Sequence, residues 1–256
     1  MAPIWDPGLY LRFENERTQP CVDLVNRIPL DDPREIVDLG CGPGNSTAVL
    51  AQRWPKAAIT GIDHSPEMLD RARRDRPEIA WQLADIGLWT PDRQVDLVFS
   101  NAAFQWIHGH RQVLPRLVES LAPGGVFAMQ IPFHLQSALH RAILEVARSG
   151  PWSARLAAIE PVFEILAPEQ YYDLLAPRAT RITLWLTEYQ HVMADAEAIV
   201  SWIRGTGLRP YLQALEAAEL EPFLDRFRRR VEEAFPVRAG GTRILPFPRL
   251  FVVLVK

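Results

Sequence analysis

A glycine and three polar side chains end four successive apolar runs of this sequence, and they are the residues best placed to do chemistry. The runs EIVDLG, AAITGID, IAWQLAD and VDLVFSN end at or near Gly40, Asp63, Asp85 and Asn101. Each run has the length and composition of a buried strand. In a parallel sheet the carboxyl ends of the strands meet at one edge, where open α/β sheets bind their ligands. We therefore expect these four positions to share one ligand site.

A glycine-rich loop follows the first run. The stretch IVDLGCGPGNST carries Gly40, Gly42 and Gly44 directly before an expected helix at Ser46–Arg53. Glycines permit a tight turn and a close approach of ligand to backbone, and the helix start offers N–H groups to an anion. A tight turn without any ligand fits the same residues. The spacing G-x-G-x-G also differs from the dinucleotide pattern G-x-G-x-x-G, which argues against a nicotinamide-dependent oxidoreductase.

The later strand ends carry groups that suit an adenosine. Asp63 can accept hydrogen bonds from both hydroxyls of a ribose, although an acid there can also belong to a helix start, with Ser65 as cap. Asp85 can accept a hydrogen bond from the amino group of an adenine, and Asn101 lies at the carboxyl end of its expected strand. Four such residues at four strand ends favour a ligand over packing alone.

In order and spacing, these motifs resemble those of the class I S-adenosylmethionine-dependent methyltransferases. The matching segments are VDLGCGPGNST, GIDHSPEML, ADI and DLVFSNAAFQW. The resemblance implies S-adenosyl-L-methionine as cofactor and S-adenosyl-L-homocysteine as product. It implies that the glycine loop binds the methionine end, Asp63 the ribose, Asp85 and Ile86 the adenine, and that Asn101 lies beside the sulfonium. The cofactor-binding residues implied are Tyr10, Arg17, Gly40, Cys41, Gly42, Asn45, Asp63, His64, Met68, Asp85, Ile86, Asn101 and Trp106.

The alternation of apolar runs and helical stretches between residues 36 and 131 predicts a parallel sheet with helices on both faces. Helices are expected at 46–53, 66–74 and 111–121, with LAPGG (121–125) as a helix end, a turn and a return into the next strand. We predict a Rossmann-like class I methyltransferase fold, an α/β fold of about seven mainly parallel strands with a helical lid. One domain would comprise an N-terminal helical flap (1–30), the cofactor-binding core (31–132), and lid insertions with the last two strands (133–256).

A second cluster of polar residues lies in the expected lid. The segment WIRGTGLRPYL carries Trp202, Arg204, Arg209 and Tyr211 around a glycine turn. Guanidinium groups bind carboxylates in bidentate fashion, so these four residues, with Arg12, are the candidate substrate-binding residues. The arginines can equally end a helix and extend into solvent. Arg243 is a weaker candidate of the same kind.

Taken whole, the chain resembles the trans-aconitate 2-methyltransferase family, through WDPGLYLRFENERTQP, WIRGTGLRPYL and FPRLFVV as well as the cofactor motifs. The resemblance implies esterification of one carboxylate of trans-aconitate, and of related tricarboxylates more weakly. An ionised carboxylate needs no general base, so we predict no catalytic side chain, and structural or surface roles for His108, His110 and His134. The alternative is a carboxyl methyltransferase for malonyl-carrier protein or another small carboxylic acid, with RARRDR (71–76) as docking surface. A non-catalytic cofactor-binding module is the third possibility.

The composition limits the class of protein. The chain has 256 residues, a net charge of −3 and a hydrophobic fraction of 48%. This charge does not attract nucleic acid or an anionic membrane. The two cysteines, Cys21 and Cys41, have neither a disulfide nor a metal-ligand pattern. We therefore expect a cytoplasmic protein without metal, membrane or nucleic-acid partner, and a monomer or weak dimer.

Overall fold

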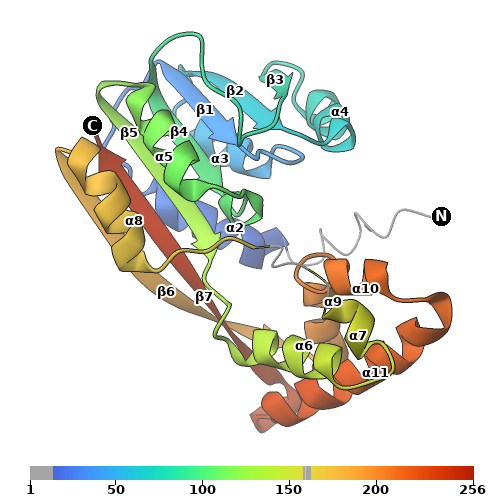
Figure 1. Cartoon of the computed structure of the whole chain (residues 1–256). Coiled ribbons are helices and arrows are strands. Elements are labelled where there is room, and N and C mark those ends of the chain that lie inside the picture. The colour runs from blue at the N-terminus through green and yellow to red at the C-terminus, as the bar shows by residue number, and fades with distance from the viewer. Residues whose placement is uncertain (1–13, 158, 160–162) are drawn as a thin grey trace. The chain divides into compact units, whose positions relative to one another are not determined.

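The computed structural model describes residues 14–157, 159 and 163–256 (Figure 1). Its strands are β1 (Glu35–Leu39), β2 (Ala58–Asp63), β3 (Ala80–Leu83), β4 (Val95–Asn101), β5 (Leu121–Pro132), β6 (Arg181–Met193) and β7 (Arg243–Val255). Its helices are α2 (Glu14–Val25), α3 (Asn45–Arg53), α4 (Pro66–Asp75), α5 (His110–Glu119), α6 (Ala138–Arg148), α7 (Ser153–Leu156), α8 (Pro168–Leu175), α9 (Ala196–Arg204), α10 (Arg209–Ala214) and α11 (Ala217–Ala234). Short 3-10 turns occur at η1 (Phe104–Trp106), η2 (Ala176–Arg178) and η3 (Ala239–Gly241).

The seven strands form one sheet in the order β3-β2-β1-β4-β5-β7-β6. Pairing is parallel from β3 to β5, whereas β5 and β7 are antiparallel. This confirms the mainly parallel seven-stranded sheet predicted from the sequence. The chain winds from β1 outward to β3 and then returns to the other side of β1 at β4. Open α/β sheets bind ligands where the winding direction reverses in this way, outside the carboxyl ends of the strands.

The burial of each strand follows from its place in the sheet. β1, β4 and β5 lie inside the sheet and are almost continuously apolar and buried, as parallel strands covered on both faces must be. β3 is an edge strand and is largely exposed, and β6 at the other edge alternates between exposed and partly buried residues over most of its length. Right-handed crossovers place α3 and α4 on one face and α5 on the other.

One sequence-based prediction about the fold is wrong. The segment LAPGG was expected to end a helix, turn and return into the next strand, but α5 ends at Glu119 and Leu121 already belongs to β5. Leu121 pairs with Val95, and the register of the two strands shifts before Leu97. Gly124 adopts φ +76° there. Glycine and proline therefore mark a strand irregularity here, because Leu121 before it and Val126 after it both pair with β4.

Two compact units divide the chain. Among the described residues, the sheet unit comprises 17–132, 163–187 and 249–256, and the helical unit comprises 14–16, 133–157, 159 and 188–248. Two of the boundaries fall within β6 and β7. The helical unit has its own apolar core, which includes Trp152, Trp202 and Phe223. The ring of Trp152 packs edge-on against Phe223 at 5.2 Å between centroids. In the part of the chain that the structure describes, no helix is long and apolar enough to cross a bilayer.

Candidate active site

The glycine loop begins where β1 ends, at the reversal point of the sheet. The N–H groups of Gly40 and Cys41 both donate to the carbonyl of Ile62, at 2.8 and 3.0 Å, so the loop is held against β2. The three loop glycines have φ values of +73° (Gly40), +55° (Gly42) and +93° (Gly44), which other residues rarely adopt. Gly44 is the N-cap of α3 and provides no side-chain cap. The first N–H groups of α3 therefore remain available to a ligand.

Gly40 and Gly42 differ in what surrounds them. A β-carbon at Gly40 would lie 2.2 Å from the β-carbon of Ala103 and 3.2 Å from Cδ1 of Ile86, so only glycine fits. A β-carbon at Gly42 would meet no heavy atom within 4 Å. Gly40 is therefore needed for packing against the residues that follow β3 and β4. Gly42 leaves open space in front of the loop, which suits a ligand lying against the backbone.

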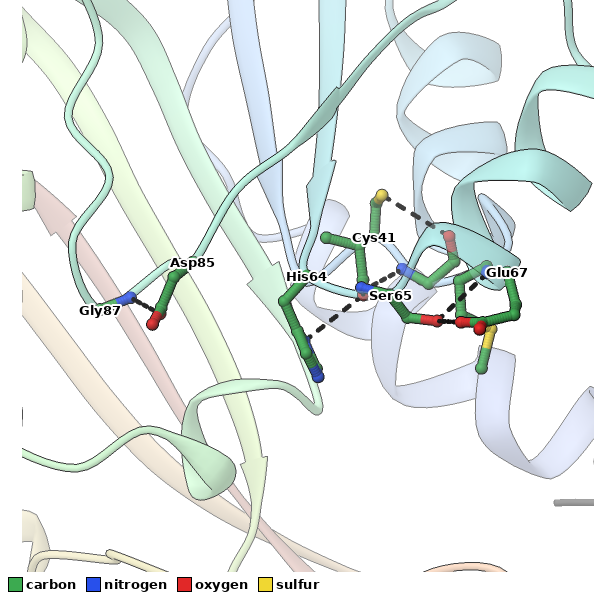
Figure 2. Close-up of polar contacts among 9 residues, drawn as sticks. Cys41, His64, Ser65, Glu67, Asp85 and Gly87 are labelled. Carbon is green, nitrogen blue, oxygen red and sulfur yellow. Dashed lines mark hydrogen bonds and ion pairs between the residues drawn. The ribbon is translucent and has the colours of Figure 1, made fainter. Parts of the chain in front are cut away.

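Asp63 at the end of β2 joins the loop to the start of α4. Its Oδ2 accepts the Gly42 N–H at 2.9 Å, and its Oδ1 accepts the Ser65 N–H at 2.9 Å. The Ser65 hydroxyl in turn accepts the Met68 N–H and caps α4, as predicted (Figure 2). Each carboxylate oxygen has two lone pairs, so Asp63 keeps acceptor capacity for ribose hydroxyls. His64 is 82% exposed, and its Nδ1 lies 3.6 Å from Oδ1 of Asp63.

Asp38 lies within β1, beneath the loop, and is fully buried. Its Oδ2 accepts the hydroxyls of Ser46 and Thr47 at 2.7 and 2.6 Å, which fixes the first turn of α3 on the sheet. Burial raises the pKa of Asp38 from 3.8 to about 6; the two hydroxyl hydrogen bonds oppose this shift, and the nearby charge of Asp63 adds to it. Sequence inspection did not single out this residue, because it reads as part of the strand.

The turn after β3 carries the expected adenine-binding residues. Oδ1 of exposed Asp85 accepts the Gly87 N–H at 2.8 Å, so its side chain stabilises its own turn (Figure 2). Ile86 is buried at 3% exposure, close to Gly40. Arg116 of α5 donates to the Gly87 carbonyl at 2.5 Å. The turn is thus fixed against the helix that follows β4.

The carboxyl ends of β4 and β5 carry an unusual set of amides. Asn101 pairs in register with Gln130 across these two strands. Oδ1 of Asn101, Oε1 of Gln105 and both amide atoms of Gln130 are buried, and none of these four atoms has a hydrogen-bond partner among the described residues. A buried polar group without a partner costs roughly 1–3 kcal/mol. Ala102, which follows Asn101 in the chain, has φ +56°, and it is the one residue other than glycine with positive φ in the described ranges.

The histidines near this edge have structural surroundings. Nε2 of His110 bonds to the Phe104 carbonyl at 2.8 Å and its Nδ1 to the Tyr171 hydroxyl at 2.9 Å, and burial lowers the His110 pKa. Glu164 accepts the backbone N–H groups of Gly109 and His110, where its charge favours the start of α5. His108 is 66% exposed. His134 is buried and stacks on Phe247.

The remaining cofactor candidates are distributed along the same edge. Cys41 is buried, and burial raises the pKa of its thiol. Asn45, the first residue of α3, and Met68 of α4 are half-buried. Trp106 is 37% exposed and packs on Phe163 with 4.6 Å between ring centroids. Tyr10 and Arg12 lie outside the described residues, as does the side chain of Arg17.

Four candidate substrate residues, Trp202, Arg204, Arg209 and Tyr211, lie in the helical unit. Arg204 ends α9 and Arg209 begins α10; both are exposed, and neither makes an ion pair or hydrogen bond through its side chain with the described part of the chain. Tyr211 is half-buried, and burial raises its pKa. Trp202 is only 3% exposed, and its ring lies 4.8 Å from His191 and 5.8 Å from Phe247. The surroundings of Trp202 are those of a core residue. Arg243 donates to the carbonyls of Glu232 and Phe235.

Comparison with known proteins identifies the family. Residues 36–125 match the family described as "Methyltransferase domain". The chain is 50% identical over 255 residues to trans-aconitate 2-methyltransferase of Methylobacterium radiotolerans, with 98% of each protein covered. It is 49% identical over 254 residues to the enzyme of the same name from Azoarcus sp. (strain BH72), covering 99% of this chain and 100% of the relative. The chain belongs to the trans-aconitate 2-methyltransferase family.

Solved structures of lower sequence identity share the fold. The YcgJ protein from Bacillus subtilis superposes with a TM-score of 0.60 at 12% identity, covering 93% of this chain and 98% of that one. A putative methyltransferase from Bacillus halodurans gives a TM-score of 0.61 at 12% identity, covering 92% and 98%. The predicted class I methyltransferase fold is therefore confirmed for this member of the trans-aconitate 2-methyltransferase family. The predicted S-adenosylmethionine cofactor is confirmed by the methyltransferase domain and the named relatives.

Neither Gln130 nor Gln105 was among the site residues predicted from the sequence of this member of the trans-aconitate 2-methyltransferase family. A signal for Gln130 was present, because it is the one polar side chain in the apolar run GGVFAMQIP and lies close to the end of that run. Gln105 gave no comparable signal, since its burial depends on the 3-10 turn η1 after β4. Glu164 was also missed. It lies 54 positions from His110 in the chain, and only the fold brings the two together.

Proposed function

We propose that this chain transfers the methyl group of S-adenosylmethionine to a carboxylate of trans-aconitate and releases S-adenosylhomocysteine. The observation that carries the proposal is the identity of about half of all positions over nearly the whole length of two proteins named for this activity. That identity extends well beyond the methyltransferase domain at 36–125. It therefore includes the helical unit, where the candidate substrate arginines lie.

The residues at the reversal point fit the cofactor. The open space before Gly42 suits a ligand that lies against the loop backbone, and the uncapped start of α3 suits the methionine carboxylate. Asp63 has spare acceptor capacity for the ribose hydroxyls, and Asp85 with Ile86 would border the adenine. The other proposed contacts are Tyr10, Arg17, Gly40, Cys41, Asn45, His64, Met68, Asn101 and Trp106.

The chain's own residues would act by binding and orientation. When bound, S-adenosylmethionine supplies an electrophilic methyl group on a positively charged sulfur. The accepting carboxylate is ionised at neutral pH, so no side chain has to remove a proton. The bonded, buried surroundings of His110 agree with a structural role rather than that of a base. Alignment of two bound reactants can supply roughly 7–11 kcal/mol of the barrier, and Asn101 at the end of β4 is placed to contribute to it.

The carboxylates that do not react need cationic partners, because burying an unpaired charge costs several kcal/mol. Arg204 and Arg209 are the proposed partners, with Tyr211 as an additional donor, since both arginines are exposed and their side chains make no hydrogen bond or ion pair with the described chain. Arg12 remains a candidate on sequence grounds. Trp202 would act by packing the helical unit beneath them.

The organisation of the chain into flap (1–30), core (31–132) and lid (133–256) stays a prediction, as do cytoplasmic location and a monomeric or weakly dimeric state. The two compact units group residues 163–187 and 249–256 with the core instead. A role of the helical unit in covering the substrate is likewise part of the proposal.

Methyl transfer from labelled S-adenosylmethionine to a panel of di- and tricarboxylic acids tests the proposal. We expect strong transfer to trans-aconitate, and weaker transfer to cis-aconitate and saturated analogues. A parallel reaction with malonyl-carrier protein tests the alternative acceptor. Binding of S-adenosylhomocysteine without transfer to any carboxylic acid of the panel would reject the substrate and leave the fold and cofactor intact.

A further inference from the structure

Gln130 is a polar residue in the apolar interior of β5. It is 0% exposed, and neither its amide oxygen nor its amide nitrogen has a hydrogen-bond partner within the described residues. Because both atoms are unpaired, the observation holds whichever way the amide is turned. Most buried side-chain amides in native proteins are paired. An exception at a strand end that faces the ligand crevice calls for a functional explanation.

The neighbouring amide belongs to Asn101. The two residues are register partners of the parallel strands β4 and β5, so their side chains lie next to each other on one face of the sheet. Two residues earlier, Phe99 and Ala128 occupy the same face, and Phe99 is in register with Asp38 of β1. Asp38 bonds to α3. The two amides thus lie on the face that α3 covers, at the edge that carries the glycine loop.

The backbone directly after Asn101 adopts an unfavourable conformation that packing does not require. Ala102 takes φ +56°, a conformation costly for alanine. Gln105 stabilises it by donating its side-chain N–H to the Ala102 carbonyl at 2.6 Å, while Oε1 of Gln105 stays buried and unpaired among the described residues. Unpaired buried polar atoms and positive φ concentrate at functional sites.

We propose that the amides of Gln130 and Asn101 together bind the carboxylate that receives the methyl group. The proposal rests on the carboxyl methyltransferase activity proposed above and adds the residues that hold the acceptor. Asn101 is half-exposed, so an incoming carboxylate would contact it first. Gln130 is buried next to it and would reach the same carboxylate by rotating its long side chain. The carboxylate would accept one N–H from each amide, and the unpaired amides would gain partners.

Neutral donors suit this role better than arginine does. A guanidinium group paired with the reacting oxygen would neutralise the negative charge that attacks the methyl group and would hold the ground state too strongly. An amide orients the carboxylate and leaves most of its charge in place. The arginines are then reserved for the carboxylates that do not react.

The test replaces Gln130 by side chains of the same length. In Gln130→Met, kcat/KM for trans-aconitate should fall roughly 10- to 150-fold, the range for one hydrogen bond to a charged group. The Kd for S-adenosylhomocysteine should change less than about twofold, and the Tm should stay equal or rise, because an unpaired buried amide has become apolar. Gln130→Glu should lose more activity, since its carboxylate repels the acceptor. The matched control is Gln94→Met on the exposed surface, for which we expect wild-type kinetics.

The outcomes separate the possible roles. Unchanged kcat/KM in both Gln130 variants overturns the proposal. A fall in Tm together with activity assigns Gln130 to the fold, and a weaker Kd for S-adenosylhomocysteine assigns it to the cofactor; either result also overturns it. If the wild-type enzyme methylates no carboxylic acid, the proposed function fails, and calorimetric binding of tricarballylate to the S-adenosylhomocysteine complex decides instead. Weaker binding by Gln130→Met than by wild type supports the inference, and equal binding or none rejects it.

Discussion

The carboxylate of Asp63 accepts the backbone N–H of Gly42 at 2.9 Å, so the end of β2 determines the conformation of the loop that follows β1. The same carboxylate accepts the Ser65 N–H and thereby fixes the start of α4. Asp63, which was expected to bind a ribose or to belong to a helix start, therefore also organises the loop that would bind the methionine end. Its two roles are compatible, because each oxygen accepts one protein N–H and retains a second lone pair.

Asp63→Asn should weaken cofactor binding more than the loss of one ligand hydrogen bond would. The asparagine amide offers only one acceptor oxygen, and its NH2 group would face a backbone N–H of Gly42 or Ser65. We expect the Kd for S-adenosylhomocysteine, measured by calorimetry, to rise at least about 100-fold, from the sum of two charge-assisted contacts. Asp92→Asn, an exposed acid outside the site, is the control. A Kd within threefold of wild type would show that Asp63 serves the fold alone.

Gly40→Ala and Gly42→Ala should separate packing from binding. At Gly40 the new methyl would lie 2.2 Å from Cβ of Ala103, so we expect a loss of about 3 kcal/mol or more in unfolding free energy. At Gly42 no atom lies within 4 Å of the new methyl, and the cost should be only the about 1–2 kcal/mol of the left-handed backbone.

The variant with the smaller loss of stability, Gly42→Ala, should show a large loss of cofactor affinity. Gly42→Ala should remain folded yet lose most of its affinity for S-adenosylhomocysteine, because its methyl occupies the space in front of the loop. Chemical denaturation and calorimetry on both variants measure the two effects. Tight binding by Gly42→Ala would contradict the proposed position of the cofactor against this loop.

Much of the fold could be predicted because local pattern and tertiary context agree there. β1, β2 and β4 are largely apolar runs, β2 and β4 end in the polar residues Asp63 and Asn101, and Ser65 with Pro66 marks the start of α4 in the sequence as in the structure. The segment LAPGG shows the limit. Its local composition favours a turn, but pairing of Leu121 with Val95 decides in favour of a strand. Local composition does not predict the pairing of segments that are distant in the sequence.

The candidate site residues divide in the same way, into those suggested by the local sequence and those that depend on tertiary contacts. Asp63, Asp85 and Asn101 were identified because strand order places the ends of their strands at one edge. Trp202 was grouped with the substrate residues because of its sequence neighbours, yet it is buried against His191 and Phe247, from distant strands. The unpaired state of Gln130 is also a tertiary property, since it depends on what β4 and β7 place around β5.

Asp38 should make the stability of this protein decrease as the pH rises through the acidic range. Its pKa is raised to about 6 in the folded state from 3.8, chiefly by burial, so the folded protein holds this proton more tightly than the unfolded chain does. Stability linked to the proton is therefore lost between about pH 4 and pH 6. One pKa unit corresponds to about 1.4 kcal/mol, which gives a change of about 3 kcal/mol.

Asp38→Asn isolates this effect because other groups titrate in the same range. Unfolding free energies of both proteins, measured by urea titration between pH 4 and pH 7, should diverge in favour of the variant as the pH rises. Asp92→Asn, exposed and unbonded in the described structure, should track the wild type. A constant difference between wild type and Asp38→Asn over this range would mean that Asp38 keeps an ordinary pKa.

Arg204→Ala and Arg209→Ala should impair use of the substrate and leave the fold and the cofactor site unchanged. Both side chains are exposed and make no hydrogen bond or ion pair in the described chain, so truncation should change the Tm by less than about 2 °C. Loss of a bidentate contact to a carboxylate should raise KM for trans-aconitate roughly 10- to 100-fold per arginine. Arg229→Ala is the matched control, because it is also exposed and unpaired in the described residues and lies on α11 of the same unit. Saturation kinetics with trans-aconitate, alongside the Kd for S-adenosylhomocysteine, measure the effect. If all three variants behave like the wild type, the carboxylates of the substrate are bound by other cations and the assignment to α9 and α10 is wrong.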